Sequence, residues 1–186
     1  MKTPILETAR LILRPISLDD APAIQKYFNN WDIIKYMNYR VPWPYPDDGA
    51  ESFMHENILP RIAKGGLYVW AITEKGGDDE LIGLIEFNQD DHSEDNRHFW
   101  LAQPFHGHGY MTEVVCAIND FVFEVLGLER YEVSNSIGNI ASRRIKEKTG
   151  AVFLKTVPCD FHSGDTISER WEVTKASWAE AKKELK

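Results

Sequence analysis

Hydrophobic positions along the chain follow two different periods, and the alternation of these periods predicts a succession of strands and helices. Short apolar runs bounded by glycine, proline or polar residues predict strands at residues 11–15, 67–74, 80–88, 97–102, 131–136, 151–158 and 166–174. Helical spacing predicts helices at residues 17–28, 47–64, 139–150 and 176–185. The clearest helix ends before Gly127, and one face of it carries Val114, Ile118, Phe121, Val122 and Val125.

This order of elements predicts an α/β fold, with helices and a mixed α+β sheet in a single domain over residues 1–186. Hydrophobic residues make up 43% of the chain, which is enough to bury a sizeable core. No apolar stretch approaches the roughly 20 residues of a membrane span, and the start of the chain lacks a signal-peptide pattern. We therefore expect a cytoplasmic protein without a membrane partner. The two cysteines, Cys116 and Cys159, are too few for a disulfide framework.

The net charge of -8 is concentrated in one half of the sequence. Residues 1–95 carry 9 Lys and Arg against 17 Asp and Glu, whereas residues 96–186 carry 12 of each kind. Binding to phosphate backbones needs clustered positive charge, so this composition argues against nucleic acid as a partner. The acidic half could attract a cationic amine, or it could simply keep the surface soluble.

The stretch from Phe99 to Glu113 reads as a strand, a loop with glycines at 107 and 109, and the start of a helix. Glycine permits positive φ and lets a ligand approach the backbone closely. The first amides of a helix have no partner within the helix, so such a loop can hold an anion such as a pyrophosphate. A tight turn without a ligand has the same features. The stretch is neither a dinucleotide-binding glycine pattern nor a P-loop, because their other residues are absent.

The same loop resembles the acetyl-CoA pyrophosphate loop of the GNAT superfamily of N-acetyltransferases, whose pattern is Gln/Arg-x-x-Gly-x-Gly/Ala. His106 takes the first position of this pattern in place of Gln or Arg, Gly109 the glycine position and Met111 the last. The sequence Gly-Tyr-Met-Thr-Glu is similar to that of the RimJ/RimL branch. Further blocks that resemble this branch follow the expected order, at residues 6–15, 99–101, 139–151 and 174–178.

The resemblance implies the GNAT fold, a central twisted mixed sheet flanked by helices. In this fold two neighbouring parallel strands, here 97–102 and 131–136, splay apart at a bulge near Leu101, and their free backbone groups hold the pantetheine arm. The residues implied to bind acetyl-CoA as a cosubstrate are Leu101, Gln103, His106, Gly107, His108, Gly109, Tyr110, Met111, Thr112, Asn139, Ser142 and Arg144. The amine would attack the acetyl carbon directly, without an acyl-enzyme.

Three residues are candidates for moving protons. Glu86 is the first candidate for the base that deprotonates the amine, or it is an exposed carboxylate at a strand end. His98 is the second candidate, because imidazole titrates near neutrality, or it simply fills a strand position. Ser142 could donate a proton to the departing thiolate, as the branch implies, or it could bond to the backbone at a helix start. Lys146 replaces the tyrosine that acts as general acid in many GNAT enzymes.

Other polar and aromatic residues have less specific interpretations. Arg143, Arg144, Lys146 and Lys148 could meet the phosphates of CoA or form a solvated helix face, whereas Asn139 could cap its helix, contact CoA or do both. Glu113 is in the first turn of a helix, where its negative charge interacts favourably with the positive end of the helix dipole. His106 and His108 lack a third ligand at a recognisable spacing, so we expect no metal. An aromatic cluster could wall an acceptor groove or pack internally; it comprises Trp31, Tyr36, Tyr39, Trp43 and Tyr45.

The sequence therefore predicts an acetyl-CoA-dependent N-acetyltransferase that acts on a primary amine, as a monomer or homodimer. A protein N-terminal α-amine is the leading acceptor, by resemblance alone. The alternative acceptors are small amines such as a polyamine or an antibiotic. Two readings of a different class are a catalytically silent acyl-CoA-binding domain and a nucleotide-binding phosphate loop.

Overall fold

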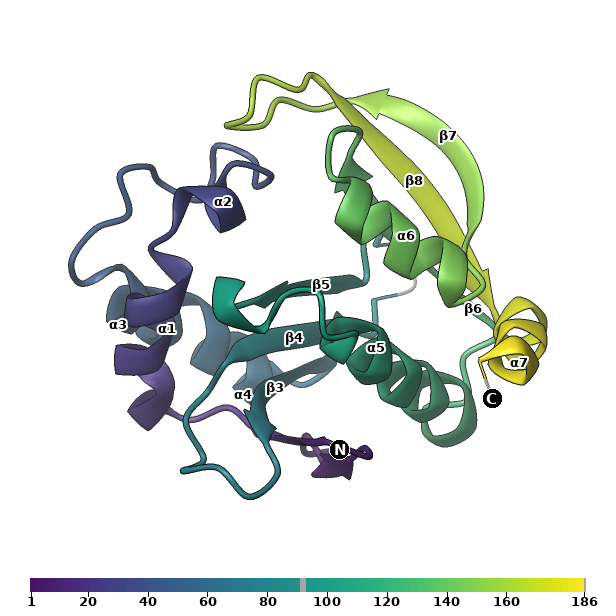
Figure 1. The fold of residues 1–186 in the computed structure, drawn as a ribbon, viewed down its shortest axis with the longest axis horizontal. Coiled ribbons are helices and arrows are strands. Elements are labelled where there is room, and N and C mark those ends of the chain that lie inside the picture. The colour runs from purple at the N-terminus through teal and green to yellow at the C-terminus, as the bar shows by residue number, and fades with distance from the viewer. Residues whose placement is uncertain (91–92, 186) are drawn as a thin grey trace.

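The computed structural model describes residues 1–90 and 93–185, and its strands form two antiparallel sheets (Figure 1). The first sheet has the strand order β1-β2-β3-β4-β5, and the second has the order β6-β8-β7. The strands of the first sheet are β1 (Leu6–Glu7), β2 (Leu11–Pro15), β3 (Leu67–Glu74), β4 (Gly83–Asn88) and β5 (Arg97–Leu101). Those of the second sheet are β6 (Arg130–Ser136), β7 (Val152–Pro158) and β8 (Ile167–Thr174).

The two sheets meet where β5 and β6 begin. The Asn96 amide donates to the Glu132 carbonyl at 2.8 Å, and the Glu132 amide donates to Asn96 Oδ1 at 3.0 Å. Past this junction, the described strands include no ladder between β5 and β6. The splayed strands expected from the sequence are therefore present at the boundary between the two sheets. The expected place is wrong, because the strands part beside Asn96, and β4 and β5 pair in regular register through Leu101 without a bulge.

Helices cover both faces of the first sheet, and α6 lies beside the second sheet (Figure 1). The helical segments are η1 (Leu18–Asp20), α1 (Ala21–Phe28), α2 (Trp31–Ile34), α3 (Gly49–Phe53), η2 (Met54–Ile58), α4 (Leu59–Lys64), η3 (Gln103–Phe105), α5 (Tyr110–Asp120), η4 (Phe121–Val125), α6 (Ile140–Lys148) and α7 (Lys175–Glu184). All the predicted helices are present, and two of them contain a π-helical turn, η2 and η4. No helix in the described part of the chain is long and apolar enough to cross a membrane.

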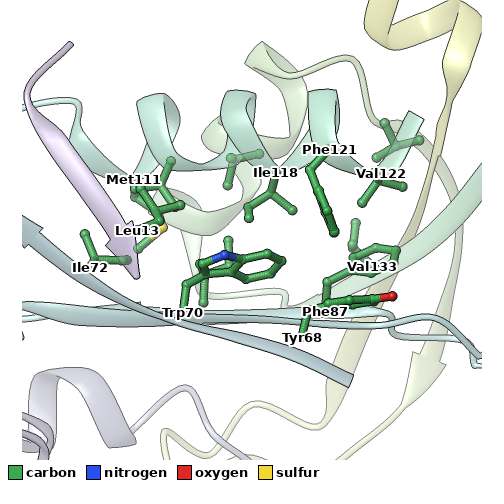
Figure 2. Close-up of a cluster of buried hydrophobic side chains, with 14 of the residues drawn as sticks. Leu13, Tyr68, Trp70, Ile72, Phe87, Met111, Ile118, Phe121, Val122 and Val133 are labelled. Atoms are coloured by element: carbon green, nitrogen blue, oxygen red, sulfur yellow. The ribbon is translucent and has the colours of Figure 1, made fainter. Parts of the chain in front are cut away.

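The core has two layers because β3 and β4 are buried on both faces. Figure 2 shows the layer under α5 and η4, where Trp70 lies beneath Ile118 and Phe121. The opposite layer joins Val69, Leu84 and Trp100 to the helices α1 and α3 and the turn η2. Burying one such large side chain contributes about 1.5–3 kcal/mol, so these layers hold the loop after β5 on a rigid support.

One predicted core position is wrong. Val125 was expected on the buried face with Val122, but 58% of its surface is exposed. The π-helical turn η4 explains the difference, because its wider turn rotates the following positions off the face that the α-helical period predicts.

Candidate active site

A pocket of about 660 Å³ opens where the end of β5, the loop after it and the starts of α5 and α6 face α2. We call it the central pocket. The residues expected to bind acetyl-CoA that line it are Leu101, Gln103, His106, Gly107, Gly109, Tyr110, Met111, Thr112, Asn139, Ser142 and Arg144. Two sequence blocks about thirty residues apart therefore converge on one cavity. Of that predicted set, His108 is not part of the wall.

The loop before α5 presents its backbone to the central pocket. Gly107 and Gly109 have φ of 81° and 78°, a conformation that side-chain-bearing residues rarely adopt. Gly109 is the N-cap of α5, and the next three residues, Tyr110 to Thr112, line the pocket. Their amides precede that of Glu113, the first to donate within the helix, to the Gly109 carbonyl at 3.1 Å, so they can bind an anion at the positive end of the helix dipole. The predicted anion site is thus geometrically possible.

Arg10 fixes this loop from outside the pocket. Its Nη1 donates to the carbonyl of His108 at 2.9 Å, and its Nε donates to Glu113 Oε2 at 2.7 Å. Its guanidinium also lies 4.5 Å from the centre of the Tyr110 ring, whose hydroxyl donates to Glu74 at 2.6 Å. The carbonyl of His108 and the ring of Tyr110 therefore help to hold the loop in place through their contacts with Arg10. No local sequence pattern indicates this role of Arg10, because its partners lie about a hundred residues away along the chain.

Two side chains of the loop link β5 to its surroundings. His106 Nε2 lies 2.7 Å from the carbonyl oxygen of Leu101, and because a carbonyl only accepts, this nitrogen carries the proton. Gln103 Oε1 accepts from Asn30 Nδ2 at 3.0 Å, and Asn30 is the N-cap of α2. The end of β5 is thereby tied to both the loop and α2, which form opposite walls of the pocket.

The start of α6 brings Ser142 to the central pocket. Asn139 caps this helix, with its Oδ1 accepting from the Ser142 amide at 3.1 Å. The Ser142 hydroxyl accepts in turn from Lys146 Nζ at 2.8 Å. Burial, aided by the nearby charge of Arg97, lowers the pKa of Lys146 to about 7. The expectation that Lys146 meets phosphates or lies on a solvated face is wrong, because this side chain is 1% exposed.

The remaining basic residues of α6 face two ways. Arg143 pairs with the buried carboxylate of Glu169 on β8, with 3.0 Å between Arg143 Nε and Glu169 Oε2, and so joins α6 to the second sheet. Arg144 and Lys148 are exposed and line the central pocket. Only these two cations of the run are placed to meet an anionic ligand.

The two predicted bases form a cluster outside the wall of the central pocket. Glu86 on β4 and His98 on β5 are paired across the sheet, with Glu86 Oε1 3.0 Å from His98 Nδ1. Asp95 Oδ2 lies 3.2 Å from His98 Nε2. Burial lowers the pKa of His98, but the hydrogen bonds and charges of Asp95 and Glu86 outweigh it and raise this pKa to about 10. His98 is therefore a cation at neutral pH and holds no free site for a proton.

The aromatic cluster divides into a buried and an exposed part. Tyr45 is buried, and its ring centroid lies 5.3 Å from that of Phe28. Trp31 and Trp43 are 41% and 40% exposed, and their ring centroids are 5.2 Å apart. Tyr36 lines the central pocket. Packing thus explains Tyr45, whereas the other aromatic residues stand at the pocket or on the surface near it.

The loop between β7 and β8 holds this aromatic segment in place. The amide of Ser163 donates to the carbonyl of Lys35 at 2.7 Å, and His162 Nε2 donates to the carbonyl of Val41 at the same distance. An isolated β-bridge between Asn38 and Phe161 lies beside them. The wall of the pocket that contains α2 therefore depends on a loop from the far end of the chain.

Neither cysteine is arranged as a nucleophile. Burial raises the pKa of the Cys116 thiol to about 11, and this residue does not line the central pocket. Cys159 lies near the end of β7 and does not line it either. In the residues described, no three His, Cys, Asp or Glu side chains gather as they would around a metal ion.

Known proteins are similar to this chain in sequence and in fold. Residues 10–152 match the family described as the acetyltransferase (GNAT) domain. The uncharacterized N-acetyltransferase YoaA of Bacillus subtilis (strain 168) is 32% identical over 149 residues, which are 79% of this chain and 82% of YoaA. The fold is similar to that of RimL, described as a ribosomal L7/L12 alpha-N-protein acetyltransferase in complex with coenzyme A, with a TM-score of 0.76, 16% identity, and coverage of 92% of this chain and 98% of RimL.

A second solved structure with this fold is the microcin C7 self immunity acetyltransferase MccE in complex with acetyl-CoA and AMP. Its TM-score is 0.74 at 14% identity, with 89% of this chain and 93% of that chain covered. Likeness at this level of identity shows the fold, whereas the family match covers well over half of the chain. The protein therefore belongs to the GNAT family and is an acetyltransferase.

Proposed function

We propose that the central pocket binds acetyl-CoA and that the enzyme transfers the acetyl group to a primary amine, with a protein N-terminal α-amine as the leading acceptor. The observation that carries this proposal is the convergence of the loop before α5 and of Ser142 on one cavity. The donor set fits an anionic diphosphate, because backbone amides of α5 and the side chains of Arg144 and Lys148 face the same space. A volume of about 660 Å³ suits a ligand of this size.

The thioester of acetyl-CoA supplies the activated acetyl group. The outward edge of β5 has no ladder partner among the described strands beyond Asn96, so its backbone groups are available to hold the pantetheine arm. Phe99, Leu101 and Ile145 add apolar surface to the same wall. We propose that Ser142 protonates the departing sulfur, because its hydroxyl is buried at the wall of the pocket and held by Lys146.

Glu86 is the group that we assign as the proton acceptor for the amine. Its carboxylate is 7% exposed and lies one cross-strand pair from Phe99, a residue of the pocket wall. Because Glu86 is not in the wall itself, a proton reaches it through water or an intervening group. His98 is a poor alternative, since its raised pKa of about 10 leaves it already protonated at neutral pH.

Two observations bear on the acceptor. The acidic half of the chain contributes Asp32 to the pocket wall, where a protonated amine would compete with Lys35, whose Nζ lies 2.6 Å from Asp32 Oδ1. The structural likeness to RimL, whose name specifies a protein α-amine, supports a protein N-terminus. The exposed pair of Trp31 and Trp43 favours the second candidate, a small amine stacked on an aromatic wall.

The test combines binding and turnover. Calorimetric titration with acetyl-CoA, ATP and NAD should show binding of acetyl-CoA alone. Release of free thiol should then depend on the amine, in a panel of peptides with free N-termini, polyamines and aminoglycosides. Blocked peptides with an acetylated N-terminus are the matched control. Absence of acetyl-CoA binding would refute the proposal, and binding without thiol release from any acceptor would favour a silent acyl-CoA-binding domain.

A further inference from the structure

Lys146 is a buried amine in the middle of α6, and it is 1% exposed. Its Nζ donates to Ser142 Oγ at 2.8 Å, one helical turn earlier. Among the salt bridges formed by residues 1–90 and 93–185, none involves Lys146. A buried amine without a carboxylate partner costs stability, and such groups concentrate at functional sites. The position of Lys146 therefore calls for an explanation other than packing.

The groups around Lys146 keep its amine close to the point of losing its proton. Burial is the largest effect and lowers its pKa, and the cation of Arg97 on β5 acts in the same direction. The carboxylates of Asp95, which precedes β5, and Glu169 on β8 raise the pKa but only partly offset the first two effects. The result is a pKa of about 7, so the amine exchanges a proton at neutral pH.

Arg97 is itself buried and is held by neutral groups from the other elements that pack here. Its Nη1 donates to Asn119 Oδ1 of α5 at 3.0 Å and contacts the hydroxyl of Tyr131 of β6 at 2.5 Å. Because neither partner neutralises the guanidinium, its positive charge continues to act on Lys146. The low pKa thus follows from the packing of α5, β5 and β6 around α6.

Ser142 connects this amine to the central pocket, since Ser142 lines the pocket and Lys146 does not. We propose that Lys146 is a positioning residue that orients the Ser142 hydroxyl and returns to it the proton that Ser142 gives to the departing thiolate. This inference rests on the proposed acetyl transfer. It adds a source for the proton and an explanation of why a lysine occupies a site closed to solvent.

The amine nitrogen forms a bond to the acetyl carbon, and the bond between this carbon and sulfur breaks. The sulfur takes the proton of the Ser142 hydroxyl, and Ser142 takes one from the Lys146 ammonium, which becomes a neutral amine. The proton lost by the attacking amine goes to Glu86 and then to solvent. After release of the products, a proton from solvent returns to Lys146 through Ser142, whose side chain borders the pocket.

The experiment uses the full chain with acetyl-CoA and the best amine from the panel, and compares Lys146→Met, Ser142→Ala, the double variant and the control Lys183→Met. Methionine fills the space of lysine without a charge, so the variant should fold. Lys183 lies on α7 with a side chain that is 71% exposed, and its replacement should leave kcat unchanged. Calorimetry with acetyl-CoA and thermal unfolding are measured for every variant.

We expect Lys146→Met to lower kcat by about a hundredfold, the lower end of the range for general acid–base groups, with an unchanged Kd for acetyl-CoA. The double variant should be no slower than Ser142→Ala, because Lys146 acts only through Ser142. The wild-type kcat should include a limb that falls with pH near 7, and Lys146→Met should lack this limb.

An unchanged kcat in Lys146→Met, or losses that multiply in the double variant, would overturn the role of Lys146 while leaving acetyl transfer by the wild type intact. A wild-type protein that does not bind acetyl-CoA would instead overturn the proposed function, and the role of Lys146 with it. The two failures are therefore distinguishable by the calorimetry of the wild-type protein.

Discussion

The backbone amide and the guanidinium of Arg10 both donate to the carboxylate of Glu113, although 103 positions separate the two residues along the chain. The distances are 2.9 Å from the amide and 2.7 Å from Nε. Because Glu113 is in the first turn of α5, this contact fixes the helix start against β2 and, with it, the loop that borders the central pocket.

Replacing Arg10 with methionine should weaken acetyl-CoA binding without changing kcat. The variant keeps the backbone bond to Glu113 but loses the side-chain bonds to Glu113 and to the carbonyl of His108, and a hydrogen bond of a charged group is worth about 1.5–3 kcal/mol. Solvent exposure reduces this value, so we expect a rise in Kd of about tenfold. Calorimetry measures it, with Arg130→Met as the control, because Arg130 pairs with Glu172 on the second sheet. Equal Kd values for both variants would show that the contacts of Arg10 with Glu113 and His108 do not shape the pocket.

Gly107→Ala and Gly76→Ala should cost similar stability but differ in ligand binding. Both glycines have positive φ, 81° and 79°, and an added Cβ would meet nothing within 4 Å at either position. The strain should lower the free energy of unfolding by about 1–2 kcal/mol in each variant. Of these two glycines, only Gly107 lines the central pocket, so only Gly107→Ala should raise the Kd for acetyl-CoA. An equal effect of both on Kd would contradict an anion site in the loop.

Arg144→Gln should weaken binding of acetyl-CoA more than binding of acetyl-pantetheine, which lacks the nucleotide phosphates. An exposed cation attracts a phosphate through solvent, so the loss should be about threefold to tenfold at low salt and smaller at high salt. Calorimetry at two salt concentrations tests this expectation. Lys155→Gln on β7 is the control, since Lys155 is outside the pocket wall. If acetyl-pantetheine loses as much affinity, Arg144 does not act on the phosphates.

The His98 cluster should stabilise the protein at neutral pH and lose this effect in base. Partners raise the pKa of His98 from 6.5 to about 10, so the folded state holds a proton that the unfolded state releases. The contribution is fully present below about pH 6.5 and fades as the pH rises towards 10. Urea unfolding of the wild type and His98→Gln should therefore give a difference that shrinks over this range. A difference that is constant with pH would contradict the raised pKa.

Lys146 should have the opposite effect on stability over an overlapping range. Its pKa is lowered from 10.5 to about 7, so the unfolded state binds more protons between these values and the stability of the wild type rises with pH. Relative to Lys146→Met, the wild type should be least stable below pH 7 and should gain stability up to about pH 10.5. The measurement is urea unfolding of both proteins at four pH values. A gap that stays constant between pH 7 and pH 10.5 would show that the amine keeps its proton when buried.

Most elements of the fold were predictable because their signals are local. The apolar face of α5 and the cap of α6 at Asn139 depend on neighbours within a few residues, and both predictions are confirmed apart from Val125. The sequence does not predict β1 and α2. These elements have only two and four residues, which is too short to show a period.

The parts of the site that the sequence missed depend on distant or unusual contacts. The contact of Arg10 with the loop before α5 has no sequence signal, because the partners of Arg10 come from another part of the chain. The sequence predicts a solvated or phosphate-binding position for Lys146, because lysine rarely enters a core. Its spacing from Ser142, four residues on one helix, was the available clue, and only packing shows that this face points inward.

The loop between β7 and β8, which holds the segment after α2, has a consequence for the order in which the enzyme matures. The walls of the central pocket come from residues 32–37, 99–112 and 139–148, and the first of these walls is held by residues 161–163. During synthesis the site cannot be complete until the chain has been made through residue 163. A cosubstrate that binds this site then stabilises these three walls together, although they are far apart along the chain.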